Sequence, residues 1–137
     1  MWDQGRVHYT SSEIWFQPSA IIDEMMSREW LPDVVETVVS DEKFIDVTAK
    51  TDEARSELKL YIVNIAPEQK SLTINVEGFK YKSAARVWTL GGCELTDYNT
   101  VEDQTRVAPV TSKISFKKKD MTLTVPRYSY TVITLTR

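Results

Sequence analysis

The chain has 137 residues, of which 42% are hydrophobic and 27% are charged, a composition that excludes disordered, collagen-like and coiled-coil proteins. Its length predicts one domain, or one domain with a piece of another, which buries about 68% of its unfolded surface and needs no disulfide or metal to form a core. The net charge is −3, and the only basic run, residues 117–119, argues against a nucleic-acid-binding surface, which needs clustered basic and aromatic residues. The lack of any apolar run of about 18 residues argues against a membrane span.

One helix is predicted near the N-terminus, beginning at Gln17-Pro18 and ending by Trp30. Proline is favoured in the first turn of a helix, where its missing N–H is not needed. The helix is expected to end by Trp30, because Leu31 precedes a proline and therefore favours an extended backbone. The residues that recur at helical spacing and should form its buried face are Ile21, Ile22, Met25 and Met26.

Short strands are predicted in succession after the helix. Residues 58–62 and 72–76 alternate between apolar and polar side chains, which is typical of half-buried strands. Further strands are expected at residues 34–39, 44–47, 87–90, 114–116, 121–125 and 130–135. Without intervening helices, such a series predicts a mainly β fold: an antiparallel β-sandwich of jelly-roll type, preceded by one short α-helix.

Two connections carry specific expectations. Residues 114–116 are expected to pair with residues 121–125 as a hairpin. The basic run between them, Lys117, Lys118, Lys119 and Asp120, is interpreted as the solvated turn of this hairpin and not as a phosphate-binding patch. The long polar stretch from Cys93 to Pro109 is expected to be ordered, and to be functional or to contact another domain. Its oxygen-bearing residues leave open a loose calcium site as the alternative to a solvated loop: Asp97, Asn99, Glu102 and Asp103.

No catalytic, cofactor or metal site is predicted. One cysteine, Cys93, and one histidine, His8, give no internal disulfide, no thiolate or imidazole metal centre and no convincing Ser/His/Asp site. Four glycines form no phosphate-binding loop. A glycosidase needs a pair of carboxylates, but twenty acidic residues offer no rule for choosing one. The first ten residues lack the pattern of a signal peptide, and no compartment is assigned.

Aromatic residues and charge suggest two kinds of partner. The first thirty residues are rich in aromatic rings, and rings can stack on sugars; the guesses for such a platform are Trp15, Phe16 and Tyr81. The alternative is that these rings pack the helix onto the sheet. Residues 1–57 hold 13 acidic and 5 basic residues, whereas residues 58–137 hold 7 acidic and 12 basic residues. The two halves are therefore expected to attract each other or a neighbouring domain.

Six segments form a recognisable series along the chain: Gln17-Pro18-Ser19, Tyr61-Ile62-Val63-Asn64, Trp88-Thr89-Leu90-Gly91-Gly92, Asp97-Tyr98-Asn99-Thr100-Val101-Glu102, Val107-Ala108-Pro109 and residues 125–135. Together these segments resemble the C-terminal domain of α-L-arabinofuranosidases of glycoside hydrolase family 51. The similarity covers nearly the whole chain in the right order, although residues 103–105 lack the proline expected after the glutamate.

The resemblance implies that residues 1–40 are the end of a catalytic (β/α)8 barrel, including its last helix, and that residues 41–137 are a C-terminal β-sandwich. The family's acid/base is a glutamate directly after an asparagine, and the three asparagines here are followed by Ile65, Val76 and Thr100. The implied function is therefore non-catalytic: the domain stabilises the barrel of an enzyme that breaks down hemicellulose or arabinan. The alternative function is that of a carbohydrate-binding module that uses surface aromatic residues. Association of the protein into a homo-oligomer is left open.

Overall fold

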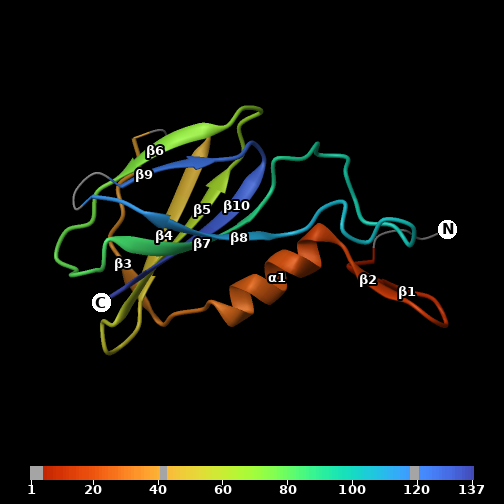
Figure 1. The fold of residues 1–137 in the computed structure, drawn as a ribbon, viewed down its shortest axis with the longest axis horizontal. Coiled ribbons are helices and arrows are strands. Elements are labelled where there is room, and N and C mark those ends of the chain that lie inside the picture. The colour runs from red at the N-terminus through yellow and green to blue at the C-terminus, as the bar shows by residue number, and fades with distance from the viewer. Residues whose placement is uncertain (1–4, 41–42, 118–120) are drawn as a thin grey trace.

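The strands form three antiparallel sheets, and the computed structural model describes residues 5–40, 43–117 and 121–137 (Figure 1). The largest sheet has six strands in the order β3-β4-β5-β10-β7-β8, and two-stranded sheets are formed by β6-β9 and by β1-β2. The strands are β1 (Val7–Tyr9), β2 (Ile14–Phe16), β3 (Asp33–Val35), β4 (Ile45–Thr51), β5 (Glu57–Asn64), β6 (Lys70–Ile74), β7 (Ala84–Leu90), β8 (Val110–Ser115), β9 (Met121–Val125) and β10 (Ser129–Thr136).

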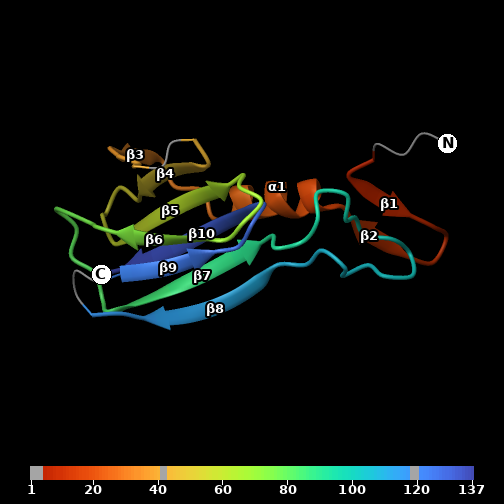
Figure 2. The same ribbon diagram turned by 90° about the horizontal axis from the view of Figure 1, so that it is seen from above.

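One helix, α1 (Pro18–Arg28), follows the β1-β2 hairpin. Its bounds confirm the prediction made from Pro18 and from the Leu31-Pro32 step. Within the described ranges, no helix has the length and apolar character needed to span a membrane. Figures 1 and 2 both show the hairpin projecting away from the sheets at the far end of α1.

The two faces of the large sheet are covered by different elements. Figure 1 shows β6 and β9 above the sheet and α1 below it. Strand β10 supplies both faces, because Ile133 and Leu135 join the core under β6-β9 whereas Val132 joins the core under α1. Burial on both faces explains why β10 is apolar or β-branched along most of its length. The mainly β, antiparallel architecture with one short helix is confirmed.

The predicted hairpin between residues 114–116 and 121–125 is wrong. Strand β8 pairs with β7 at the edge of the large sheet, and β9 pairs with β6 in the opposite layer. The chain therefore changes sheets between these strands, which alternation of apolar residues cannot reveal because both arrangements bury the same side chains. Of the expected turn, Lys118, Lys119 and Asp120 lie outside the described residues.

Two further differences concern the N-terminal third. The strand expected at residues 34–39 is confined to β3, and Val38 is 90% exposed. The β1-β2 hairpin was not predicted at all. Its strands have three residues each, which is too short for an alternating pattern to stand out.

Candidate interaction surface

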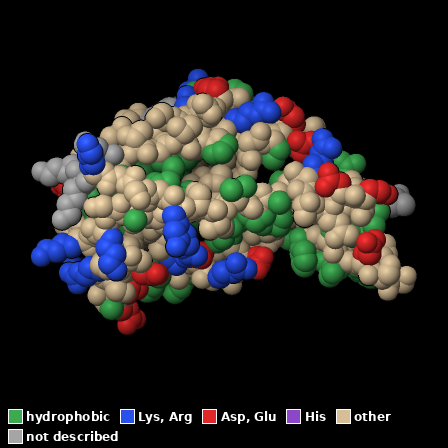
Figure 3. Space-filling view, in the orientation of Figure 1, with side chains coloured by type: hydrophobic (Ala, Val, Ile, Leu, Met, Phe, Trp, Pro, Cys, Tyr) green, Lys and Arg blue, Asp and Glu red, His purple; other side chains and the backbone are tan. Residues whose placement is uncertain are grey.

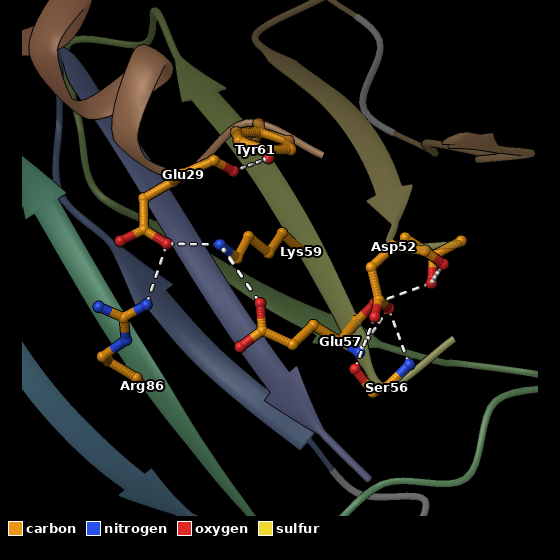
Figure 4. Close-up of polar contacts among 8 residues, drawn as sticks. Glu29, Asp52, Ser56, Glu57, Lys59, Tyr61 and Arg86 are labelled. Carbon is orange, nitrogen blue, oxygen red and sulfur yellow. Dashed lines mark hydrogen bonds and ion pairs between the residues drawn. The ribbon is translucent and has the colours of Figure 1, made fainter. Parts of the chain in front are cut away.

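A buried ionic network attaches the end of α1 to the large sheet (Figure 4). Glu29 follows the last helical residue, and its Oε2 accepts hydrogen bonds from Lys59 Nζ at 2.7 Å and from Arg86 Nη2 at 2.9 Å. Lys59 Nζ also lies 3.5 Å from a carboxylate oxygen of Glu57. The side chains of Glu29 and Lys59 are only 6% and 7% exposed. The network therefore joins the helix end to β5 and β7 across the intervening strand β10.

The charges of this network support one another. Burial by itself would raise the pKa of Glu29, but the hydrogen bond and charge of Lys59, together with the charge and hydrogen bond of Arg86, outweigh it and lower that pKa below its ordinary value. Burial, with the nearby Tyr130 and Glu29, raises the pKa of Tyr61 to about 12. The Tyr61 hydroxyl donates a hydrogen bond to the backbone carbonyl of Glu29.

Sequence reasoning missed this network. The alternation in residues 58–62 indicated a half-buried strand with Lys59 on its polar side, but Lys59 is buried against Glu29. A lysine between two apolar residues in a strand is a weak signal. No rule of spacing connects it to a carboxylate thirty residues away.

The long loop between β7 and β8 is held by Asn99. The side chain of Asn99 donates to the carbonyls of Phe16 at 2.8 Å and Val107 at 3.0 Å, and its Oδ1 accepts from the Val107 N–H at 2.7 Å. The Asn99 carbonyl in turn accepts from Gln17 Nε2 at 2.7 Å and Trp15 Nε1 at 3.1 Å. The loop therefore contacts strand β2 and Gln17, the residue before α1.

These contacts leave the loose calcium site unassembled. The amide of Asn99 is engaged with backbone groups, and Asp97 pairs with Arg106 at 2.7 Å and accepts from the Glu94 N–H. Across the residues that the structure describes, no three His, Cys, Asp or Glu side chains come close enough together to hold a metal ion. Asp97 and Asn99 thus stabilise the conformation of the loop through these contacts.

The motif residues Asn64, Gly91 and Ser129 meet at one end of the large sheet. Asn64 is 1% exposed; its Nδ2 donates to the Pro126 carbonyl at 2.7 Å, and its Oδ1 accepts from the Ala66 N–H at 2.9 Å. Ser129 donates its hydroxyl to the same Pro126 carbonyl at 2.7 Å. Gly91 has φ of +147°, and a Cβ there would lie 2.6 Å from the Tyr128 carbonyl oxygen. These motif residues therefore build turns.

The three aromatic residues proposed for sugar binding do not come together. Trp15 and Phe16 lie on β2, where Trp15 stacks on His8 with ring centroids 5.5 Å apart. Tyr81 lies against Phe79 and Phe116 at the edge of the core under β6-β9. Phe16 is 48% exposed, whereas Trp15 and Tyr81 are half-buried.

The alternative, that the N-terminal rings pack α1 onto the sheet, is wrong for the two most exposed of them. Tyr9 is 78% exposed and Trp30 is 59% exposed. The aromatic residues under α1 are instead Trp88, Tyr61 and Tyr130 from the sheet. Trp2 lies outside the described residues.

An apolar groove of about 890 Å³ runs beside α1. One wall is the helix and the segment after it, the floor is formed by β4 and β5, and the other wall is the loop after β7. Figure 3 shows hydrophobic side chains gathered along α1 and continuing toward the hairpin. Four apolar side chains in the groove are more than half exposed, namely Met26 (51%), Trp30 (59%), Ile65 (60%) and Leu95 (76%).

Comparison with known proteins identifies a family and a fold. The model of the α-L-arabinofuranosidase C-terminal domain family matches residues 6–129. An arabinose-bound GH51 α-L-arabinofuranosidase superposes with a TM-score of 0.87 and 23% identity over 98% of this chain. The thermostable GH51 α-L-arabinofuranosidase from Thermotoga petrophila superposes with a TM-score of 0.83 and 22% identity over 95% of this chain. A family 44 xyloglucanase from Paenibacillus polymyxa superposes with a TM-score of 0.60 and 20% identity over 76% of this chain. A search of curated proteins gives no match.

The chain is much shorter than the enzymes that it resembles. It covers 22% of the arabinose-bound enzyme, 31% of the Thermotoga petrophila enzyme and 19% of the xyloglucanase. At these sequence identities the superpositions establish the shared fold.

Proposed function

The chain belongs to the α-L-arabinofuranosidase C-terminal domain family, and from this membership we propose that it is the non-catalytic β-sandwich of a larger enzyme that releases arabinose from hemicellulose or arabinan. In this proposal residues 1–40 are the end of the catalytic (β/α)8 barrel, with α1 as its last helix, and residues 41–137 are the C-terminal domain. The domain stabilises the barrel by holding that helix.

The family match carries this proposal, and the ionic network gives it a physical basis. Glu29 lies in the segment assigned to the barrel, whereas Lys59 and Arg86 lie in the sandwich. The Asn99 contacts to Phe16 and Gln17 likewise join the two segments. Each link would be lost if the sandwich were removed, which would expose the apolar face of α1 that packs on Trp88 and Val132.

Removal of residues 41–137 from the complete enzyme is expected to lower the Tm of the catalytic barrel by several degrees, or to make it insoluble. The reason is that the apolar underside of α1 loses its cover. Differential scanning calorimetry of the complete and shortened enzymes measures the change, and release of nitrophenol from a nitrophenyl arabinofuranoside measures activity. An unchanged Tm contradicts the proposed role, as does hydrolysis by the 137-residue chain alone.

A second candidate function is saccharide binding by the β1-β2 hairpin. The observation that favours it is the exposure of one hairpin face: β1 and β2 pair Val7 with Phe16 and Tyr9 with Ile14, and these four side chains are 43% to 78% exposed. Rings held on a short, anchored hairpin could stack on sugars. Tyr81, which lies elsewhere, has no part in this version.

Titration of the isolated chain with arabinan and arabinoxylan oligosaccharides tests this candidate. Binding is expected to saturate at millimolar ligand and to change the fluorescence of Trp15, which lies next to Phe16 in the hairpin. Phe16→Ala should abolish the change, and Tyr98→Ala, which removes a somewhat more exposed ring from the loop (57% against 48%), should leave it intact. A flat response from the folded chain argues against saccharide binding.

A further inference from the structure

One end of the β7-β8 pair carries a concentration of positive charge. Residues 78–93 and 104–117 together contain six lysines and arginines and no aspartate or glutamate. Figure 3 shows Lys and Arg side chains gathered at the end of the molecule opposite the β1-β2 hairpin, over the start of β7. Five basic residues at this end form the basic surface: Lys80, Lys82, Arg86, Lys113 and Lys117.

Aromatic rings hold the two segments of the basic surface side by side. The ring centroid of Tyr81 lies 5.9 Å from that of Phe116 and 6.5 Å from that of Phe79, and all three rings pack against the core under β6-β9. The Phe116 N–H also donates to the Ser83 carbonyl at 3.1 Å. Because side chains alternate along an extended chain, the neighbours of these rings point away from that core. These neighbours are exposed lysines, namely Lys80, Lys82 and Lys117.

The charge of the four lysines is not neutralised within the described part of the chain. None of them forms an ion pair with a described residue. Lys113 lies directly opposite Arg86 in the β7-β8 register, and like charges in such a cross-strand pair are destabilising. Arg86 itself shares the carboxylate of Glu29 with Lys59. The fold therefore keeps several unpaired cations together at some cost, which favours an anionic partner.

The edge strand beside these lysines offers hydrogen-bonding groups. Strand β8 ends the order of the large sheet and pairs with β7, so the outer edge of β8 leaves backbone N–H and C=O groups available. Thr111, Ser112 and Ser115 are exposed along it. A lysine such as Lys113 on an edge strand discourages pairing with a further strand. The nearby rings are directed into the core, so they give no stacking platform for nucleic-acid bases. Lysines, hydroxyls and free backbone groups together fit a ligand that carries both carboxylates and hydroxyls.

We infer that the basic surface binds an acidic polysaccharide, a chain of sugars that bears uronic-acid carboxylates. The carboxylates pair with the lysines, and the sugar hydroxyls bond to the edge of β8. The choice of a polysaccharide among anionic polymers rests on the proposed function, which places the domain in an enzyme that acts on hemicellulose or arabinan. The surface attracts acidic chains through its field and holds the enzyme on them. It lies at the opposite end of the molecule from the β1-β2 hairpin (Figures 1 and 2).

Calorimetric titration of the 137-residue chain with oligogalacturonate tests this inference. Binding is expected, and it should weaken by about tenfold or more at high salt, because salt screens exposed charges. Methyl-esterified oligogalacturonate, which has the same sugars without the charge, should bind at least about tenfold more weakly for the same reason. No binding, or equal binding of the two saccharides, overturns the inference. Tighter binding of poly-L-glutamate or of single-stranded DNA also overturns it, in favour of an acidic protein or a nucleic acid.

Variants locate the binding surface. The triple variant Lys82→Gln, Lys113→Gln, Lys117→Gln is expected to weaken oligogalacturonate binding about tenfold, because it removes three exposed and individually weak charge contacts. Its Tm should stay unchanged, since all three side chains are exposed. Lys43→Gln is the matched control: Lys43 is exposed and lies just before β4, at the other end of the large sheet. An equal effect of the triple variant and the control on binding overturns the inference.

The proposed function fails by a different measurement, the Tm of the enzyme without residues 41–137. If that removal destabilises the barrel while oligogalacturonate does not bind the chain, only the basic surface is wrong. If the Tm of the barrel is unchanged while oligogalacturonate binds and the triple variant does not, the stabilising role is wrong and the basic surface stands.

Discussion

Replacing Glu29 with glutamine is expected to lower the free energy of unfolding of the chain by about 3 kcal/mol, near the lower end of the range for breaking a buried ion pair. Glutamine has the same shape but carries no charge, so among the described residues Lys59, only 7% exposed, keeps the more distant Glu57 as its charged partner. Arg86 is 47% exposed and can turn to water. Urea unfolding at pH 7, followed by circular dichroism, measures the difference.

Glu24→Gln is the matched control for this change. Glu24 pairs with Arg28 on the exposed side of the same helix, and exposed pairs at this spacing contribute about 0.3–0.5 kcal/mol. If both variants lost the same small amount of stability, the buried network would not hold the helix end.

The pH dependence of the Glu29 effect has a definite sign. The pKa of Glu29 in the folded chain lies below its ordinary value of 4.5, because Lys59 and Arg86 outweigh burial. The ionised group therefore contributes its full stability above about pH 4.5, and this contribution is lost as the pH falls through the lower, folded pKa. The stability difference between the native chain and Glu29→Gln should narrow below pH 4.5. A difference that stayed constant to lower pH would exclude the ionised carboxylate as its source.

Gly91→Ala is expected to destabilise the chain by about 3 kcal/mol or more, or to prevent folding, because backbone strain and overpacking add at this position. The φ of +147° disfavours any side chain. The added methyl group would also collide with Ser129 and with the Tyr128 carbonyl oxygen. These atoms belong to the turn that begins the central strand β10, so they cannot move without shifting the sheet.

Gly78→Ala separates the two causes. Gly78 has φ of +73°, but a Cβ there would meet nothing within 4 Å, so only the backbone cost of about 1 kcal/mol remains. Thermal unfolding of both variants gives the comparison. A Gly91→Ala variant no less stable than Gly78→Ala would show that the close approach of Ser129 is relieved at little cost.

The parts of the fold that sequence predicted correctly depend on local signals. Pro18 and Pro32 set the ends of α1 through their own backbone chemistry. Alternation located residues 58–62 within β5 and placed β6 two residues late, at 72–76 instead of Lys70–Ile74, since side-chain direction in a strand repeats every two residues.

The parts that were missed depend on contacts between distant segments. Residues 114–116 and 121–125 were correctly identified as strands, yet each has its partner elsewhere. The link between Glu29 and Lys59 joins residues thirty positions apart. The separation of Tyr81 from Trp15 and Phe16 could not be predicted for the same reason, because nothing in the sequence showed that Tyr81 packs in the core under β6-β9.

The position of β10 has a consequence for how the protein is made. Among the residues that the structure describes, this strand comes last in sequence, yet it lies in the middle of the large sheet, paired with β5 on one side and β7 on the other. Until residues 129–136 have been synthesised, β5 and β7 lack the strand that pairs with both of them, so β3-β4-β5 and β7-β8 cannot belong to one sheet. The six-stranded sheet can form only after β10 has left the ribosome. A nascent chain that lacks β10 would therefore leave the edges of β5 and β7 without a partner strand, and unpaired strand edges are prone to aggregation.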